Sequence, residues 1–347
     1  MTMPGPRTVI KCHLGEACAA LAVDNPHGRL LERPEWGMRR KELPEHLLTG
    51  SFSVRASDKA GVTRSRTLAK DLVLVSRGIR MPAASDASGA SALRAYTDLD
   101  DSSNLVSLSA ARIWGMPLPA NRSGDWRIHI ARRKGFSFPR RVNVAGHLLT
   151  LLPGEVVEHD GVRLTSPART WLDLAALLSV EDLVAAGDHL VCSHGPEFPV
   201  PKEALCSVEE LMETVGRHAG MRGVRTARAA LDLIRVGADS APETHMRVAL
   251  VNANLPEPLL NHVVRNQIGQ AVLWPDAAYL DYRVSLQYDG QHHGGADQHL
   301  RDIDRQEKSL ALGWLEVRIS KHDLEGERPA VVHKVRRALV SRGWKRL

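Results

Sequence analysis

The spacing of apolar residues changes from helical to alternating several times along the chain. Apolar stripes that begin at cap residues predict helices at 107–114, 166–175, 208–215, 224–236, 240–252 and 329–342. A further short helix is predicted through residues 308–312. Short alternating or apolar runs predict strands at 72–75, 79–81, 126–130, 261–264, 271–274, 284–289 and 313–319. The chain has 347 residues, which is more than one domain usually contains. The pattern therefore predicts a multidomain α/β (α+β) protein.

Residues 41–85 carry the pattern of a small basic module. Leu43, Leu47 and Leu48 suit a short helix, and a second short helix at 57–60 ends at Gly61. Thr63 is the expected N-cap of a basic helix that begins with residues 62–68, and the hairpin 72–81 follows. This order of helix, glycine turn, basic helix and hairpin is typical of a winged helix-turn-helix.

The segment AGVTRSRTLAKDLVLVSRGIRMP resembles the N-terminal winged-helix domain of AbiEi-type antitoxins and related actinobacterial proteins. The resemblance implies two groups of DNA-contacting side chains. On the helix that enters the major groove they are Arg64, Arg66 and Lys70, and on the wing near phosphates they are Arg77 and Arg80. The alternative is a helical module whose basic side chains are only solvated.

The distribution of charge agrees with a nucleic-acid partner for this end of the chain. Residues 1–85 hold 14 Lys and Arg against 8 Asp and Glu, whereas the other 262 residues hold 32 of each. The whole excess of +6 therefore lies in the first quarter of the sequence, and a localised basic region favours a polyanion such as DNA.

The central segment 86–200 is predicted to be mixed α/β. Five basic residues at 132–134 and 140–141 are expected near a hairpin tip, either as more nucleic-acid surface or as a solvated edge that discourages strand pairing. In the motif SPARTWLDLA, Ser166 is the expected N-cap, and Arg169 and Asp173 are expected to pair on the helix surface.

Acidic and amide side chains recur at informative positions in the C-terminal part. Asp276 follows a proline, and a second cluster at 287–289 lies 11 to 13 residues later on the next strand. Adjacent antiparallel strands bring such side chains together, and oxygen ligands suit Mg²⁺, which can activate water for phosphodiester hydrolysis. Glu243 either joins this site or is only the acid of a capping box with Ser240.

Three ordered motifs in 240–320 resemble the very-short-patch-repair-like branch of the PD-(D/E)xK restriction-endonuclease superfamily. They are SAPETHMRVAL, WPDAAYLDYRVSLQYDGQHH and DRQEKSLALGWLEVRIS. The resemblance implies a Mg²⁺- or Mn²⁺-dependent DNA endonuclease. Its metal ligands are Glu243, Asp276 and Gln287, and Asp289 and His293 position or deprotonate the attacking water. Asp304, Arg305 and Arg318 also match the family but are expected to form structural pairs.

Gln287 departs from the family, which usually has a glutamate there. An amide oxygen can still bind a cation but brings no charge, so weaker Mg²⁺ binding or loss of activity is expected. The alternative function is therefore a DNA-binding regulator of antitoxin type with a degenerate nuclease domain. A nuclease acting on RNA is a third hypothesis.

The remaining expectations concern organisation and surroundings. No apolar run of about 18 residues exists and Met1–Val23 makes a poor signal peptide, so a cytoplasmic protein without a membrane span is expected. Cys12, Cys18, Cys192 and Cys206 show no ligand-like spacing and are expected to be reduced thiols. A homodimer and a toxin–antitoxin or defence partner stay open.

The sequence divides into five predicted segments. They are an irregular extension 1–40, a winged helix 41–85, a central domain 86–200, a helical connector 201–236 and an endonuclease-like domain 237–347.

Overall fold

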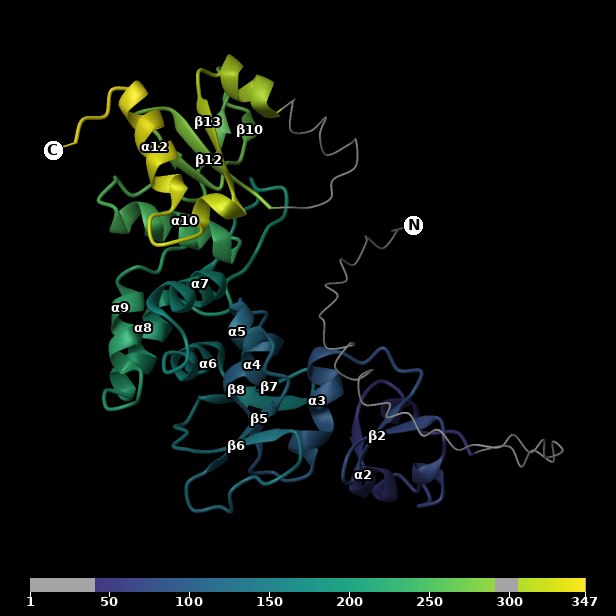
Figure 1. Ribbon diagram of the computed structural model, residues 1–347. Helices are drawn as coiled ribbons and strands as arrows, with labels where there is room; N and C mark the ends of the chain where they lie inside the picture. The colour runs from purple at the N-terminus through teal and green to yellow at the C-terminus, as the bar shows by residue number, and fades with distance from the viewer. Residues whose placement is uncertain (1–40, 291–304, 347) are drawn as a thin grey trace. The chain divides into compact units, whose positions relative to one another are not determined.

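The computed structural model describes residues 41–290 and 305–346 and has an α+β fold (Figure 1). These residues divide into two compact units. The first unit comprises residues 41–114 with 123–166, and the second comprises 115–122 with 167–290 and 305–346. The predicted central segment 86–200 therefore contributes to both units. Within the described ranges, no helix is long and apolar enough to cross a bilayer.

The first unit begins with a three-stranded antiparallel sheet in the order β1-β3-β2. Its elements are η1 (Glu45–Leu47), β1 (Phe52–Ser53), α2 (Val54–Lys59), η2 (Arg66–Leu68), β2 (Leu72–Ser76) and β3 (Ile79–Pro82). The predicted hairpin is confirmed as the β2–β3 pair. Leu43, Leu47, Phe52, Val62 and Leu72 form its small core.

The predicted basic helix at 62–68 is wrong, because only the single 3-10 turn η2 forms there. Thr63 accepts from the Arg66 N–H, which is the bond expected of an N-cap. The Thr67 hydroxyl donates to the Arg64 carbonyl at 2.8 Å, and such a local side-chain bond competes with helix hydrogen bonds. The helix expected around Leu47 is likewise only the 3-10 turn η1.

A five-stranded mixed sheet in the order β6-β5-β4-β8-β7 completes the first unit. Its elements are α3 (Gly89–Asp98), β4 (Asn104–Leu105), α4 (Ser107–Ile113), β5 (Ile128–Arg133), β6 (Val144–Leu149), β7 (Val156–His159) and β8 (Val162–Thr165). The expected hairpin around residues 132–141 is wrong, because β5 and β6 pair in parallel. The basic residues of this stretch belong to β5 and to the crossover, not to a tight tip. The short helix α5 (Ala120–Ser123) lies where the chain passes between the units.

Four helices open the second unit and pack on one another: α6 (Pro167–Leu174), α7 (Val180–Val191), α8 (Val208–Arg217) and α9 (Val224–Leu231). Residues 201–236 thus form part of a helical layer. The helix α7 was not predicted, because eight of its twelve residues are buried and leave no polar stripe. Arg169 and Asp173 do pair, at 3.0 Å, but the pair is buried and not on the surface as expected.

The C-terminal part follows the predicted order of helix, strands, helix, strand and helix. Its elements are α10 (Ala241–Asn252), β9 (Val264–Arg265), β10 (Ala271–Leu273), β11 (Ala277–Tyr279), β12 (Val284–Asp289), a helix over 305–311, β13 (Leu315–Ser320), η3 (Lys321–Leu324) and α12 (Ala330–Ser341). In the sheet β11-β12-β13, β12 is antiparallel to β11 and parallel to β13.

The two faces of this sheet have different neighbours. One face carries Ala277, Leu286 and Ile319 into a core with α10 and α12, which lie beside the sheet in Figure 1. Because side chains alternate along a strand, the other face carries Asp276, Gln287, Asp289, Glu316 and Arg318. The candidate polar residues of three strands therefore share the face opposite α10 and α12.

Candidate functional site

Asp276 and Gln287 lie side by side at the sheet, as the antiparallel pairing predicts. The Gln287 side-chain amide donates to Asp276 Oδ1 at 2.7 Å, and the Tyr288 backbone N–H donates to Oδ2 at 2.6 Å. Gln287 thus presents its NH₂ group, not its carbonyl oxygen, to the aspartate. Here Gln287 stabilises the ionised Asp276 as a hydrogen-bond donor, which differs from the ligand role expected of it.

Glu243 reaches the same place from the first turn of α10. It lines a pocket of about 250 Å³ together with Asp276, and 9% of its surface is exposed. Its Oε2 accepts the Asp239 backbone N–H at 2.9 Å, and its Oε1 accepts the Ser240 hydroxyl at 2.7 Å. The capping box with Ser240 is not formed, because the Ser240 side chain accepts no bond from the helix and Glu243 accepts the backbone N–H of Asp239 instead. Glu243 thus bonds the residues that precede α10 and lines the same pocket as Asp276.

Burial and neighbouring negative charges raise the pKa values of both carboxyl groups. Burial raises the pKa of Glu243 to about 7, and the charge of Asp276 adds to the shift. Burial also raises the pKa of Asp276 to about 6, although the Tyr288 N–H, the Gln287 amide and the charge of Arg305 oppose it. Two carboxylates that repel each other in a pocket form a site that a divalent cation would stabilise.

Of the other residues discussed for this site, Asp289, Arg305 and Arg318 are described by the structure and do not line the pocket. Asp289 is exposed at the end of β12, on the same face as Gln287, and does not line the pocket. His293 and Asp304 lie outside the described residues. Arg305 and Arg318 both pair with Glu316, at 3.5 and 2.9 Å, which agrees with the structural pairing expected of these arginines.

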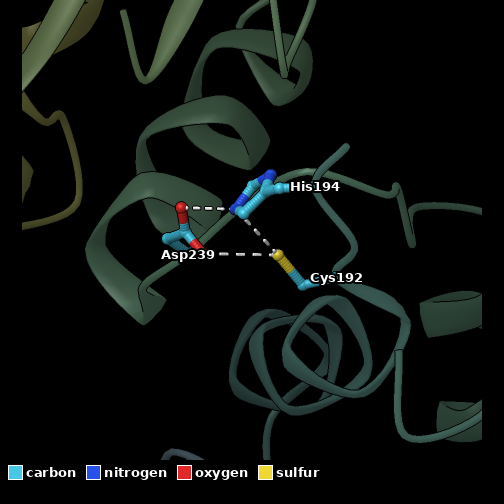
Figure 2. Close-up of side chains that lie close together, drawn as sticks. All are labelled: Cys192, His194 and Asp239. Atoms are coloured by element: carbon cyan, nitrogen blue, oxygen red, sulfur yellow. Dashed lines mark hydrogen bonds and ion pairs between the residues drawn. The ribbon is translucent and has the colours of Figure 1, made fainter. Parts of the chain in front are cut away.

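A second group of polar side chains adjoins the pocket and was not predicted. Cys192 caps the end of α7, His194 follows two residues later, and Asp239 precedes α10; Figure 2 shows their side chains pointing toward one another. His194 and Asp239 also line the pocket of Glu243. The spacing Cys-Ser-His was the only signal in the sequence, because Asp239 is 47 residues from Cys192 in the chain.

Gly237 allows the chain to pass close to this pocket. Its φ is +117°, which favours glycine, and a Cβ atom there would lie 2.7 Å from the side chain of Asn261. The Asn261 side chain in turn donates to the Ser193 carbonyl at 3.0 Å. Residues 193, 237 and 261 are therefore held together around His194 and Asp239.

The five basic residues expected to contact DNA differ in their surroundings. Arg66 makes a two-pronged pair with Asp71 at 2.9 and 2.8 Å and donates to the Lys41 carbonyl. Arg80 is half-buried and donates to the Thr67 carbonyl at 2.8 Å. These two arginines hold the local fold together, which the sequence pattern did not indicate.

The other three basic side chains are exposed, and they are Arg64, Lys70 and Arg77. Arg64 makes a pair with Asp58 at 2.8 Å in which its own side chain is 73% exposed. An exposed pair of this kind contributes little to stability and can be exchanged for another anion. The available part of the predicted DNA-binding surface therefore consists of these three side chains.

Two curated proteins of Mycobacterium tuberculosis resemble part of this chain. They are "Uncharacterized protein Rv2248" of strain H37Rv and "Uncharacterized protein MT2308" of strain CDC 1551. Each is 30% identical over 182 residues, which is 52% of this chain and 63% of the relative's length. No family model matches the chain, and neither does a solved structure. The names of these relatives state no activity.

Proposed function

We propose that the C-terminal part of the second unit binds Mg²⁺ or Mn²⁺ and hydrolyses phosphodiester bonds of DNA. The observation that carries this proposal is the pairing of Glu243 and Asp276 in one pocket, where both pKa values are raised. The order of elements from α10 to α12 and the sequence motifs support the resemblance to the very-short-patch-repair-like endonucleases.

The donor groups fit a hard divalent cation. Each carboxylate oxygen of Glu243 and Asp276 accepts a hydrogen bond and has a second lone pair. Mg²⁺ uses one or two protein carboxylates and keeps several waters, so this pair is sufficient in number. When bound, the cation supplies positive charge to a phosphoryl oxygen and to the attacking water.

The chain's own residues have distinct roles in this proposal. Glu243 and Asp276 hold the cation, and Gln287 turns its carbonyl oxygen toward it. Asp289, at the end of β12, and His293 position the attacking water or accept its proton. Arg305 and Arg318 add positive charge beside the same face of the sheet, which favours binding of an anionic phosphate.

Cleavage of DNA is tested by incubating the purified chain with supercoiled plasmid and Mg²⁺ or Mn²⁺. We expect the wild type to nick the plasmid and Asp276→Ala to lose this activity by at least about 100-fold, since a buried ligand of the cation is removed. Asp281→Ala is the matched control, because Asp281 is an exposed carboxylate on the turn between β11 and β12. Equal nicking by all three proteins would contradict the proposal.

A second function has a specific observation in its favour. Because Gln287 donates to Asp276, the aspartate already has a partner, as expected of a nuclease fold that has lost its cation. The protein would then be a DNA-binding regulator of antitoxin type. Retardation of duplex DNA without nicking, in both the wild type and Asp276→Ala, would favour this alternative.

DNA binding by the first unit is predicted to depend on the exposed basic residues. We expect Lys70→Ala and Arg77→Ala each to weaken binding to duplexes of any sequence and to lower the salt slope of binding by about 1, since one phosphate contact is lost. Titration of a labelled duplex at several salt concentrations measures both quantities.

Arg66→Ala serves as the contrasting variant in that experiment. Its two-pronged pair with Asp71 and its bond to Lys41 stabilise the fold, so it should lower the melting temperature, whereas Lys70→Ala should not. Unchanged DNA affinity in both Lys70→Ala and Arg77→Ala would exclude this surface as the DNA-binding site.

A further inference from the structure

Three different donor atoms converge at the edge of the Glu243 pocket (Figure 2). Cys192 Sγ lies 3.4 Å from Asp239 Oδ1 and 3.7 Å from His194 Nε2. His194 Nε2 lies 2.7 Å from Asp239 Oδ2. The thiol is buried and the imidazole is 5% exposed, whereas the carboxylate is 53% exposed and open to solvent.

The geometry of Cys192, His194 and Asp239 differs from that of a catalytic cysteine that is activated by a histidine base. In a nucleophile–histidine–carboxylate relay, the two partners bond different nitrogens of the imidazole ring. Here Cys192 and Asp239 both face the same nitrogen, Nε2 of His194. The three atoms instead surround a common point, as ligands do.

We propose that Cys192, His194 and Asp239 form a site for Zn²⁺. Zinc bonds of about 2.3 Å to sulfur and about 2.0–2.1 Å to nitrogen and oxygen place tetrahedral ligands roughly 3.3–3.6 Å apart. The two separations that involve sulfur are already near this range. The third, from nitrogen to oxygen, has hydrogen-bond length and lengthens by about 0.6 Å when a cation replaces the shared proton.

The choice of cation follows from the donor types. A thiolate with an imidazole and one carboxylate suits zinc, whereas Mg²⁺ takes oxygen ligands. This site is therefore selective against the cation proposed for Glu243 and Asp276. Three protein ligands leave the fourth position for water, which is the pattern of catalytic zinc centres. His194 and Asp239 line the same pocket as Glu243, so a bound zinc ion would add positive charge beside it.

Neighbouring groups fix the ligands in place. His194 and Lys202 pair through their backbones, and the ring of Phe198 stacks on the imidazole at 4.6 Å between centroids. The Lys202 ammonium lies 3.4 Å from Asp239 Oδ1, where it provides a positive charge in the absence of a metal ion. Zinc would displace this ammonium, so Lys202→Met is expected to bind zinc at least as tightly as the wild type.

Titration of the full chain with Co²⁺ alone tests the site, because Co²⁺ takes the place of zinc and absorbs light. We expect one equivalent to produce a thiolate-to-cobalt charge-transfer band with the intense visible bands of tetrahedral cobalt, and Zn²⁺ to abolish both. The bands should disappear in Cys192→Ser. Cys206→Ser is the matched control, because Cys206 is also a buried thiol but lies apart from the cluster.

Asp239→Asn provides a second variant that keeps the shape of the side chain, which is half-exposed. Its zinc affinity, measured by competition with a chromophoric chelator, should fall by more than about 100-fold, because losses outside the ligand shell already cost about 10–100-fold. Unchanged zinc affinity in Asp239→Asn, absence of the charge-transfer band in the wild type, or its persistence in Cys192→Ser would each overturn the proposal. These readouts report a thiolate ligand and do not depend on nuclease activity.

Discussion

Replacing Gln287 by glutamate is expected to strengthen Mg²⁺ binding by at least about tenfold and to raise the rate of plasmid nicking. The added carboxylate would face Asp276 at the position where the amide now donates at 2.7 Å. Two unit charges about 4 Å apart interact by about 4 kcal/mol at an effective dielectric constant of about 20. A tenfold gain in affinity needs only about 1.4 kcal/mol of the attraction between the new carboxylate and the cation.

The same substitution should destabilise the metal-free protein. It removes a hydrogen-bond donor from Asp276 and adds a negative charge beside that carboxylate, which already repels Glu243. The melting temperature should therefore be lower than that of the wild type without Mg²⁺ and should rise more when Mg²⁺ is added. Scanning calorimetry with and without Mg²⁺ measures both shifts.

A matched control is available on the turn between β9 and β10. Gln267 is exposed there, so Gln267→Glu adds the same charge outside the pocket and should change neither Mg²⁺ affinity nor nicking. If Gln287→Glu behaves like Gln267→Glu in both assays, Gln287 does not belong to a cation site.

Replacing Arg247 by methionine is expected to lower the free energy of unfolding by about 3–5 kcal/mol, because it leaves a buried carboxylate without its partner. Arg247 is fully buried on α10, and its guanidinium bonds Asp188 of α7 at 2.8 Å. It also donates to the Leu233 carbonyl at 2.7 Å and to Glu257 at 3.0 Å. One side chain therefore ties α10, which carries Glu243, to the helical layer.

The loss should also depend on pH. Burial raises the pKa of Asp188 even with Arg247 present. Without the guanidinium this pKa rises further, so the folded state holds a proton that the unfolded state releases at lower pH. The free energy of unfolding of Arg247→Met should then fall as pH rises above the ordinary pKa of an aspartate, about 4. Urea denaturation at several pH values measures the effect.

Arg235→Met is the control for that experiment. Arg235 also pairs with Glu257, at 3.1 Å, but its side chain is 42% exposed. Exposed pairs contribute about 0–1 kcal/mol, so this variant should unfold almost like the wild type. Equal destabilisation by the two substitutions would show that burial of the Arg247–Asp188 pair is not what makes it important.

Helices and strands could be predicted from the sequence where a capping residue or a clear spacing of apolar residues marks them. Ser240 and Pro242 marked the start of α10, and the apolar run after residue 284 marked β12. The strand β11 was missed because three residues are too few to show alternation. The parallel pairing of β5 with β6 was missed because strand direction depends on the path of the crossover, which local patterns do not contain.

Part of the candidate site could likewise be predicted from the sequence, and part of it could not. Asp276 directly precedes β11 and Gln287 lies on β12, so their spacing across a turn predicted that they would meet. The sequence did not reveal that Gln287 would present its NH₂ group, since amide orientation depends on the ionised aspartate beside it. Cys192 and Asp239 meet only because α7 and α10 pack together, and that contact joins parts of the chain far apart in sequence.

The pairing of Glu243 and Asp276 as a cation site is tested most directly by titrating the protein with Mn²⁺ and following the free ion by electron paramagnetic resonance. Protons leave the two carboxyl groups with pKa values of about 7 and about 6, and only the ionised groups bind the cation. We predict binding of one Mn²⁺ that is at least about tenfold tighter at about pH 8 than at about pH 5, and its loss in Asp276→Asn. Absence of binding, affinity that does not change with pH, or undiminished binding by Asp276→Asn would contradict a cation site at these carboxylates.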